Sequence, residues 1–361
     1  MTASLLLIAI MHHQSHDAKL FTVDGIVLAV HESTGRFDLD LGGGVQIVKA
    51  FGEVRLTDGS LQRTTDFPSH RVSSRRTNSV LGPRTTEVTV THTGLSNSQL
   101  RQVFWVKGSE VLARLDLLDP SGRGTNQILP LVTGAEVKFP SQGELSSLFV
   151  PYDNDKYFRF TSNAWWGGSN SGDESSEVGA IYDDSSRVGL VIGSIDHETW
   201  KSGIKFVRKG GFRAAAGVTN RFTHDTQPHG VVSGKTVQSP RFLVARYNDW
   251  RKGLERYGAL NAKVKPMLEW TGQVPFGWNS WSGHKSKVQA GDVDAALQFV
   301  RDDLPGLRSD GTCYINIDSF YDNMTRDQRV AFVKKAHAAG LKAGIYWTPF
   351  VNWGEPEWNT S

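Results

Sequence analysis

Residues 313–347, CYINIDSFYDNMTRDQRVAFVKKAHAAGLKAGIYW, decide the fold of the C-terminal part of this sequence. An apolar run at 312–318 is followed by a helical pattern and by a second apolar run at 341–347. Thr325 with Gln328 three residues later is typical of a capping box that begins a helix, and Gly340 is typical of the residue that ends one. This order predicts parallel strands joined by a helical crossover.

The same alternation begins upstream, with a short apolar run at 275–279 and a further helix. We expect that helix to start at Asp292 as its N-cap and to end before Pro305. Its apolar face carries Val293, Ala296, Leu297 and Val300. Along one face of the second helix lie Val330, Val333 and His337. Residues 275–361 are therefore predicted to form a βαβαβ unit, the first part of a larger parallel α/β domain.

The preceding region, residues 20–262, has the period of two that is typical of half-buried strands. Phe37, Leu39 and Leu41, for example, alternate with charged residues. Many short strands without intervening helices predict a large antiparallel β-sandwich. Helical spacing returns only at its end, in Trp250, Leu254 and Tyr257, so we expect a C-terminal helix and then a linker at 263–274.

Residues 1–19 form a separate N-terminal segment whose apolar core, Thr2 to Met11, has the length of a signal-peptide core. Neither a preceding Lys or Arg nor a small-residue cleavage site accompanies it, so a first buried strand is the alternative. The expected location is extracytoplasmic, secreted or periplasmic, with the cytoplasm as the alternative. The run is too short for a stable membrane span. His12, His13, His16 and Asp17 follow it, and a polar segment of this kind is more often unstructured than metal-binding.

The composition favours a neutral small-molecule partner. Forty basic and thirty-seven acidic side chains give a formal charge of +3, and Lys and Arg are not clustered as nucleic acid or an acidic membrane would require. Eleven Trp, eight Tyr and eighteen Phe offer flat apolar faces that suit sugar rings. The single cysteine, Cys313, excludes an internal disulfide. We predict no cofactor and no metal site, and the sequence leaves the oligomeric state open.

Polar and aromatic residues stand where the three predicted parallel strands end, which is where such sheets carry their chemistry. The motifs are GWNSW at 277–281, YINIDSFY at 314–321 and HAAGLKAGIYW at 337–347. In this order they resemble the first three strands of the α-galactosidase barrels of glycoside hydrolase families 27 and 36, in clan D. A large sandwich before the barrel is similar to the family 36 arrangement, whereas the amino-acid sequences of the motifs are closer to those of family 27.

The resemblance implies a (β/α)8 TIM barrel, of which this chain holds about three strands, and retaining hydrolysis of a terminal α-linked sugar by two aspartates. In such enzymes the second Trp of the first motif lines the sugar pocket and matches Trp281. The first Asp of a pair that binds sugar hydroxyls matches Asp318, and Tyr346 matches a tyrosine that faces the pocket. Trp347 stands beside it. Trp165 and Trp166, in a Gly/Ser-rich stretch, form either a sugar platform or a loop anchor.

Two departures from the family limit the assignment. Ser319 stands where the family has its second Asp, and losing one charge-assisted hydrogen bond costs about 1.5–3 kcal/mol, so galactose is in doubt as the preferred sugar. The nucleophile and the acid/base, on the fourth and sixth strands of the family, have no counterpart here, which implies an inactive fragment with no catalytic residue of its own. Two alternatives remain: a non-catalytic carbohydrate-binding or structural module, or a glycosidase for another sugar, such as a β-arabinopyranoside, an N-acetylgalactosaminide or an α-glucan.

Overall fold

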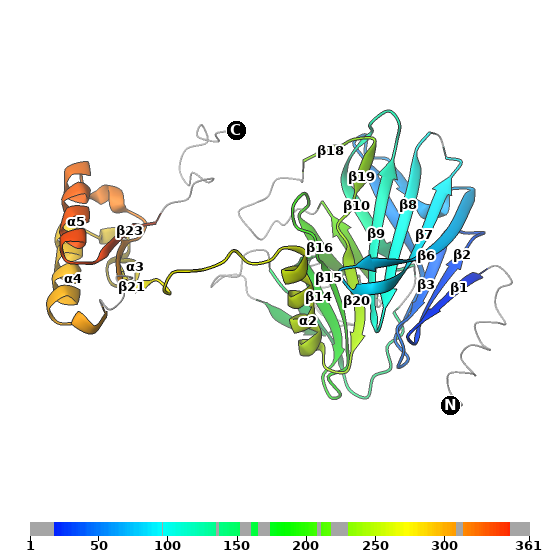
Figure 1. Cartoon of the computed structure of the whole chain (residues 1–361), viewed down its shortest axis with the longest axis horizontal. Coiled ribbons are helices and arrows are strands. Elements are labelled where there is room, and N and C mark those ends of the chain that lie inside the picture. The colour runs from blue at the N-terminus through cyan, green and yellow to red at the C-terminus, as the bar shows by residue number, and fades with distance from the viewer. Residues whose placement is uncertain are drawn as a thin grey trace. The chain divides into compact units, whose positions relative to one another are not determined.

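The computed structural model describes residues 18–95, 97–134, 137–151, 160–164, 174–207, 211–217, 230–307 and 313–346. The chain consists of two compact units, Met1–Met267 and Leu268–Ser361 (Figure 1). Trp165, Trp166 and Trp347, together with the histidines of the N-terminal segment, lie outside the described residues. The first described strand begins at Ala18.

The first unit consists of two antiparallel sheets, each with ten strands in the described part of the chain. The main path of the first sheet runs, in spatial order, through β1 (Ala18–Val23), β2 (Ile26–His31), β3 (Arg36–Asp40), β4 (Gln46–Leu56), β10 (Gly124–Val132), β17 (Gly211–Ala216), β16 (Ser202–Val207) and β13 (Glu174–Ser176). Two short strands join it: β5 (Leu61–Arg63) pairs with β4, and β18 (Val232–Ser233) pairs with β10.

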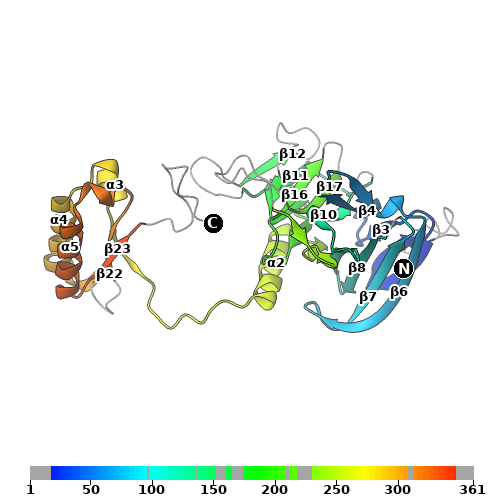
Figure 2. The ribbon, with the colours of Figure 1, turned by 90° about the horizontal axis from the view of Figure 1, so that it is seen from above.

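The second sheet runs through β12 (Thr161–Ala164), β11 (Leu145–Phe149), β14 (Val178–Asp183), β15 (Gly189–Ser194), β20 (Phe242–Tyr247), β9 (Glu110–Leu118), β8 (Gln99–Lys107), β7 (Gly82–Thr93) and β6 (Ser69–Ser79). The short strand β19 (Thr236–Gln238) pairs with β9. Figure 2 shows the two sheets as layers of the same unit.

The core lies between the two sheets because the strands alternate as the sequence predicts. In β9, Val111, Ala113, Leu115 and Leu117 are fully buried in the clusters that both sheets share. Phe37 of β3 and Phe104 of β8 meet edge to face, with ring centroids 4.8 Å apart. Contacts of this kind join the inner faces of a sandwich. The antiparallel β-sandwich is thereby confirmed.

Helix α2 (Trp250–Val264) covers part of the outer face of the second sheet (Figure 1). The carboxylate of Asp249 accepts a hydrogen bond from the amide of Arg251 and so caps the helix. Gly253 allows the close approach, because a Cβ there would lie 2.5 Å from the Tyr247 ring. Trp250 stacks on Tyr182 of β14 at 4.4 Å. The helix ends two residues beyond the 262 that the sequence predicts.

The second unit is a parallel sheet in the order β21 (Phe276–Asn279), β22 (Cys313–Ile317) and β23 (Lys342–Ile345). Its helices are α3 (Trp281–His284), α4 (Ala290–Asp302) and α5 (Arg326–Ala338), with short 3₁₀ turns at Lys285–Lys287 and Tyr321–Asn323. Figures 1 and 2 show α4 and α5 side by side on one face of this sheet. Cys313, Ile315 and Ile317 of β22 are buried against them, and Trp278 packs at the rim of the same core.

One local prediction for this unit was wrong. Helix α4 is capped by Gln289, and Asp292 is its third residue, where its carboxylate accepts the amide hydrogen of Gln289 in a capping box. On α5 the buried residues are Phe332 and Ala336, whereas Val330 and Val333 are 41% and 38% exposed. Among the described residues, no helix has the length and apolar character needed to cross a membrane.

Candidate functional site

Asn279 and Asp318 meet at the carboxyl edge of the second unit's sheet. Asn279 ends β21, and Asp318 directly follows β22. The Asn279 side-chain nitrogen donates a hydrogen bond to Asp318 Oδ2 at 3.0 Å, and the Ser319 amide donates to Asp318 Oδ1 at 2.7 Å. Both carboxylate oxygens are thus oriented by the protein. Because each oxygen has a further acceptor site, Asp318 can still accept hydrogen bonds from a ligand.

Ser280 fixes the backbone around this pair. Its side chain is fully buried, and its hydroxyl accepts a hydrogen bond from the Asp318 amide at 2.9 Å. The Ser280 amide donates to the carbonyl of Asn316 at 3.1 Å, which extends the β21–β22 pairing beyond the end of β21. The serine of the GWNSW motif therefore holds the two strand ends in register.

Two aromatic residues, Trp281 and Phe320, each follow a member of this pair by two positions in the chain. Trp281 begins α3, and its amide donates to the Asn279 side-chain oxygen at 2.8 Å. The rings of Trp281 and Phe320 lie nearly parallel, at an angle of 11° with centroids 6.4 Å apart, and each residue is 44% exposed. Exposed aromatic faces beside a carboxylate suit a ligand with one apolar and one hydroxylated side.

Phe320 has an unusual backbone conformation, with φ of 68° in the left-handed region. For a bulky residue this conformation is a genuine outlier and costs on the order of 1–2 kcal/mol. Strain of this kind persists only where the surrounding structure enforces it, and it clusters at functional sites. Phe320 therefore joins the candidate site on its conformation as well as on its position.

Two glycines allow the strands to approach each other at this edge. Gly277 has φ of 150°, and a Cβ there would overlap the backbone of Tyr314 on β22. Gly344 of β23 leaves room for the Asn316 side chain, which a Cβ would overlap. The glycines of the first and third motifs thus set the sheet geometry, and the polar residues beyond them supply the chemistry.

The structure brings together the residues that the sequence proposes for binding, as far as they are described. Trp281, Asp318 and Ser319 adjoin one another, and the Tyr346 amide donates to the carbonyl of Ile317 at 2.8 Å, which places Tyr346 beside the end of β22. Tyr346 is exposed. Asn279 and Phe320 were not among the residues predicted from the sequence, although both lie inside the three motifs. Their roles depend on the cross-strand register and on a backbone angle, which no motif displays.

No group of three or more His, Cys, Asp or Glu with the geometry of a metal site occurs among the described residues. The candidate site is therefore defined by one oriented carboxylate, an amide and aromatic faces.

No protein-family model matches the sequence, and no curated protein matches it. Solved structures do match. A β-arabinopyranosidase aligns with 91% of this chain and 55% of its own length, at a TM-score of 0.60 and 14% identity. The α-galactosidase of Lactobacillus brevis aligns with 92% of this chain and 55% of its own, at 0.52 and 9%. For the α-N-acetylgalactosaminidase of Bifidobacterium bifidum, solved with GalNAc, the values are 91% and 58%, at 0.51 and 12%.

This chain thus spans little more than half the length of the solved structures it matches. At such low identity the likeness concerns the fold alone. The chain has the fold of the N-terminal half of these glycosidases, a sandwich followed by the start of a parallel α/β domain.

Proposed function

We propose that the carboxyl edge of the β21–β22–β23 sheet binds the terminal sugar of a glycoside and forms part of the sugar pocket of a retaining glycoside hydrolase of the α-galactosidase type. The observation that carries the proposal is the Asp318 carboxylate, held by Asn279 and the Ser319 amide beside two exposed aromatic rings. A carboxylate accepts hydrogen bonds from neighbouring hydroxyls, and the aromatic rings remove the C–H face of the sugar from water.

The assignment of Asp318 is to sugar binding. Retaining hydrolysis needs two carboxyl groups about 5–5.5 Å apart, one on each side of the glycosidic bond. Within the described residues of this edge, the Asp318 carboxylate is oriented by a side-chain donor from β21, Asn279, and by the backbone amide of Ser319. This suits a group that positions a substrate.

Ser319 favours a sugar with fewer hydroxyl groups than galactose. An aspartate here would add a second carboxylate, whereas a serine offers one hydroxyl. A β-arabinopyranoside lacks the hydroxymethyl group of a galactoside and so needs one fewer partner. The β-arabinopyranosidase whose fold this chain shares is named for that sugar. We therefore propose a β-arabinopyranoside as the second candidate substrate, after an α-galactoside.

Asp318→Asn is expected to weaken sugar binding by about 10- to 100-fold, because a neutral amide replaces the charged acceptor. Isothermal titration of the 361-residue chain with methyl α-galactopyranoside and with methyl β-arabinopyranoside measures this. Asp327→Asn is the matched control, since Asp327 is an exposed carboxylate in the first turn of α5. Equal affinity of Asp318→Asn and the unmodified chain, or no binding of either glycoside, would contradict the proposal.

Ser319→Asp is expected to raise affinity for the galactoside relative to the arabinopyranoside by about tenfold. The added carboxylate can accept a hydrogen bond from the hydroxyl of the galactoside's hydroxymethyl group. The same titration measures both glycosides, and Ser319→Asn separates the effect of charge from that of size. An equal gain for the two glycosides would show that position 319 does not discriminate between them.

A further inference from the structure

The outer face of the second sheet carries a polar groove beyond the part that α2 covers. The groove has a volume of about 510 Å³ and is lined from β6, β7, β8 and β9. This volume lies within the range of small-molecule sites. Its lining residues are Ser73, Ser74, Arg75, Glu87, Thr89, Arg101, Val103, Trp105 and Arg114. All of them belong to the first unit, and none is a residue of the Asp318 site.

The strand register explains why a groove forms there. Outward-facing residues of neighbouring strands line up in rows across the sheet. One row reads Arg75, Glu87, Trp105 and Leu112, and the next reads Ser73, Thr89, Val103 and Arg114. The third reads Arg71, Thr91, Arg101 and Asp116. Short side chains occupy most of the middle row and long ones flank it, so the middle row is the floor of the groove.

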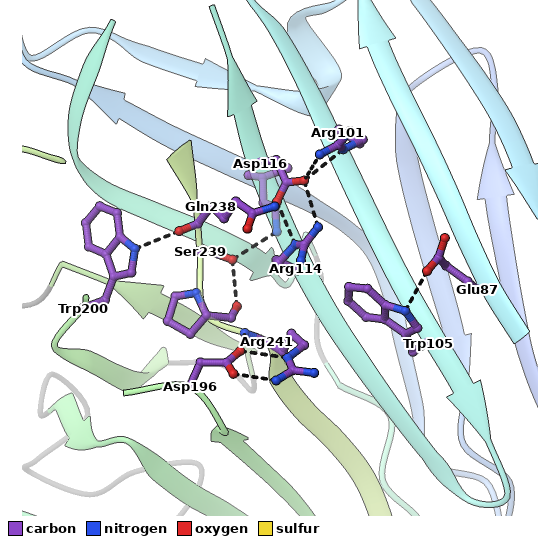
Figure 3. Close-up of polar contacts among 12 residues, drawn as sticks. Glu87, Arg101, Trp105, Arg114, Asp116, Asp196, Trp200, Gln238, Ser239 and Arg241 are labelled. Carbon is purple, nitrogen blue, oxygen red and sulfur yellow. Dashed lines mark hydrogen bonds and ion pairs between the residues drawn. The ribbon is translucent and has the colours of Figure 1, made fainter. Parts of the chain in front are cut away.

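Asp116 anchors the wall that Arg101 and Arg114 build. Its carboxylate is fully buried, and Arg101 donates to Oδ2 through Nε at 2.9 Å and through Nη2 at 2.7 Å. Arg114 forms a second ion pair with it, at 2.8 Å between Nε and Oδ1. Figure 3 shows both guanidinium groups converging on this carboxylate. A planar fork held in this way keeps a fixed orientation.

The opposite wall is equally ordered. Trp105 donates from its indole nitrogen to Glu87 at 2.9 Å, and Arg75 donates to the other oxygen of Glu87 at 2.7 Å (Figure 3 shows Glu87 and Trp105). The Arg114 guanidinium lies over the Trp105 ring, 5.2 Å from its centroid. Trp105 also packs into the apolar cluster that includes Leu260 of α2, which holds the indole in place.

The charge balance of the groove favours an anion. Three guanidinium groups, of Arg75, Arg101 and Arg114, face two carboxylates, of Glu87 and Asp116, which leaves one positive charge in excess. Arg101 and Arg114 share the single Asp116 carboxylate although each guanidinium has five N–H donors, and their side chains are 35% and 21% exposed. N–H groups of Arg101 and Arg114 therefore remain to donate hydrogen bonds to a ligand carboxylate.

The remaining lining is suited to hydroxyl groups. Ser73 and Thr89 offer hydroxyls on the floor, Glu87 offers acceptor oxygens, and Val103 contributes an apolar patch. We infer that this groove binds an acidic saccharide, with the carboxylate of a uronic acid paired to Arg101 and Arg114 and the sugar hydroxyls over Thr89 and Glu87. It would make the sandwich a second, independent carbohydrate-binding surface of the chain.

The test is titration of the 361-residue chain with digalacturonic acid, with the neutral dimethyl ester of that disaccharide as the comparison ligand. We expect the acid to bind, and its affinity to fall as NaCl is added. The ester should bind about 10-fold or more weakly than the acid. Thr89→Tyr fills the floor without touching the ion pairs and should abolish binding. Thr93→Tyr, on the same strand and face but outside the groove, is the matched control and should bind normally.

Arg101→Gln tests the charged wall separately, because Arg114 remains to pair with Asp116. This variant should lower the affinity for the acid by about 10- to 100-fold and leave the affinity for the ester unchanged. Circular dichroism of each variant separates loss of binding from loss of fold. Equal binding of acid and ester, normal binding by Thr89→Tyr, or complete displacement of the acid by equimolar sodium sulfate would each overturn the inference.

Discussion

Asp183→Ala is expected to lower the free energy of unfolding of the first unit by on the order of 5 kcal/mol, because one buried carboxylate serves five donors. Oδ1 accepts the amides of Ser185 and Ser186, both at 2.8 Å. The other oxygen accepts the amides of Gln142 and Gly143 and the Ser141 hydroxyl, at 2.7, 3.0 and 2.7 Å.

These bonds join the β14–β15 turn to the segment that precedes β11. Donation from the Ser186 amide and the Ser141 hydroxyl holds the pKa of Asp183 well below its usual range, so the carboxylate is ionised near neutral pH. Alanine would remove all five hydrogen bonds, each of which contributes about 1 kcal/mol net. Calorimetry of the first unit's unfolding transition measures the loss.

The neighbouring Asp184 supplies the control for this experiment. It is exposed, and its carboxylate accepts a hydrogen bond from the Ser146 hydroxyl at 2.8 Å. Asp184→Ala should therefore cost about 1 kcal/mol or less. If both alanine variants unfolded at the same temperature, the five-donor arrangement would not be what stabilises this corner.

Acidification from pH 6.5 to 4.5 is expected to destabilise the first unit by about 2–3 kcal/mol through His92 alone. Its side chain is fully buried, and its Nδ1 lies 2.8 Å from Nδ1 of His70. Burial, with a smaller contribution from the charge of His70, lowers the pKa of His92 to about 3. The pair can share one proton between the two nitrogens, whereas protonating both would set two donors against each other.

The sign follows from the two states. An unfolded His92 takes up a proton near pH 6.5, whereas the folded one stays neutral down to about pH 3. The unfolded state therefore binds more protons within this window, and stability falls by about 1.4 kcal/mol per pH unit as the pH decreases. Above pH 6.5 both states are neutral, and the contribution is constant.

Urea unfolding of the unmodified chain and of His92→Gln, between pH 4.5 and 7, measures this slope. The variant should lack that part of the pH dependence. His197→Gln is the control: hydrogen bonding to Glu177 raises the pKa of His197, so both states are protonated well below pH 6.5 and the slope there stays unchanged. Parallel slopes for the unmodified chain and His92→Gln would rule out the histidine pair as the cause. The range stays above that in which Asp183 titrates.

The fold was predictable from the sequence where burial alone decides it. The period of two places Phe37, Leu39 and Leu41 on one face, and the structure buries all three. Helix details were less predictable. Val330 and Val333 share a face, but so do Phe332 and Ala336, and only contact with the sheet decides which face is buried.

The candidate sites were predictable only in part, because their residues meet through register. Asp318 stands out at a strand end, whereas its pairing with Asn279 depends on how β21 and β22 align. In the groove, Arg101 and Arg114 gain their roles from Asp116 and from rows that cross four strands. The sequence gives no reason to group Thr89 with Val103, which only the register of β7 and β8 brings together.

The left-handed backbone of Phe320 bears on how a sugar would be held. A side chain that swings freely loses rotational freedom when a ligand arrives, and that loss weakens the complex. The ring of Phe320 lies nearly parallel to that of Trp281, and the backbone conformation that carries it is imposed by folding. Part of the cost of ordering this site is thus incurred during folding. A sugar that binds beside Asp318 and the aromatic rings would therefore meet a preorganised surface.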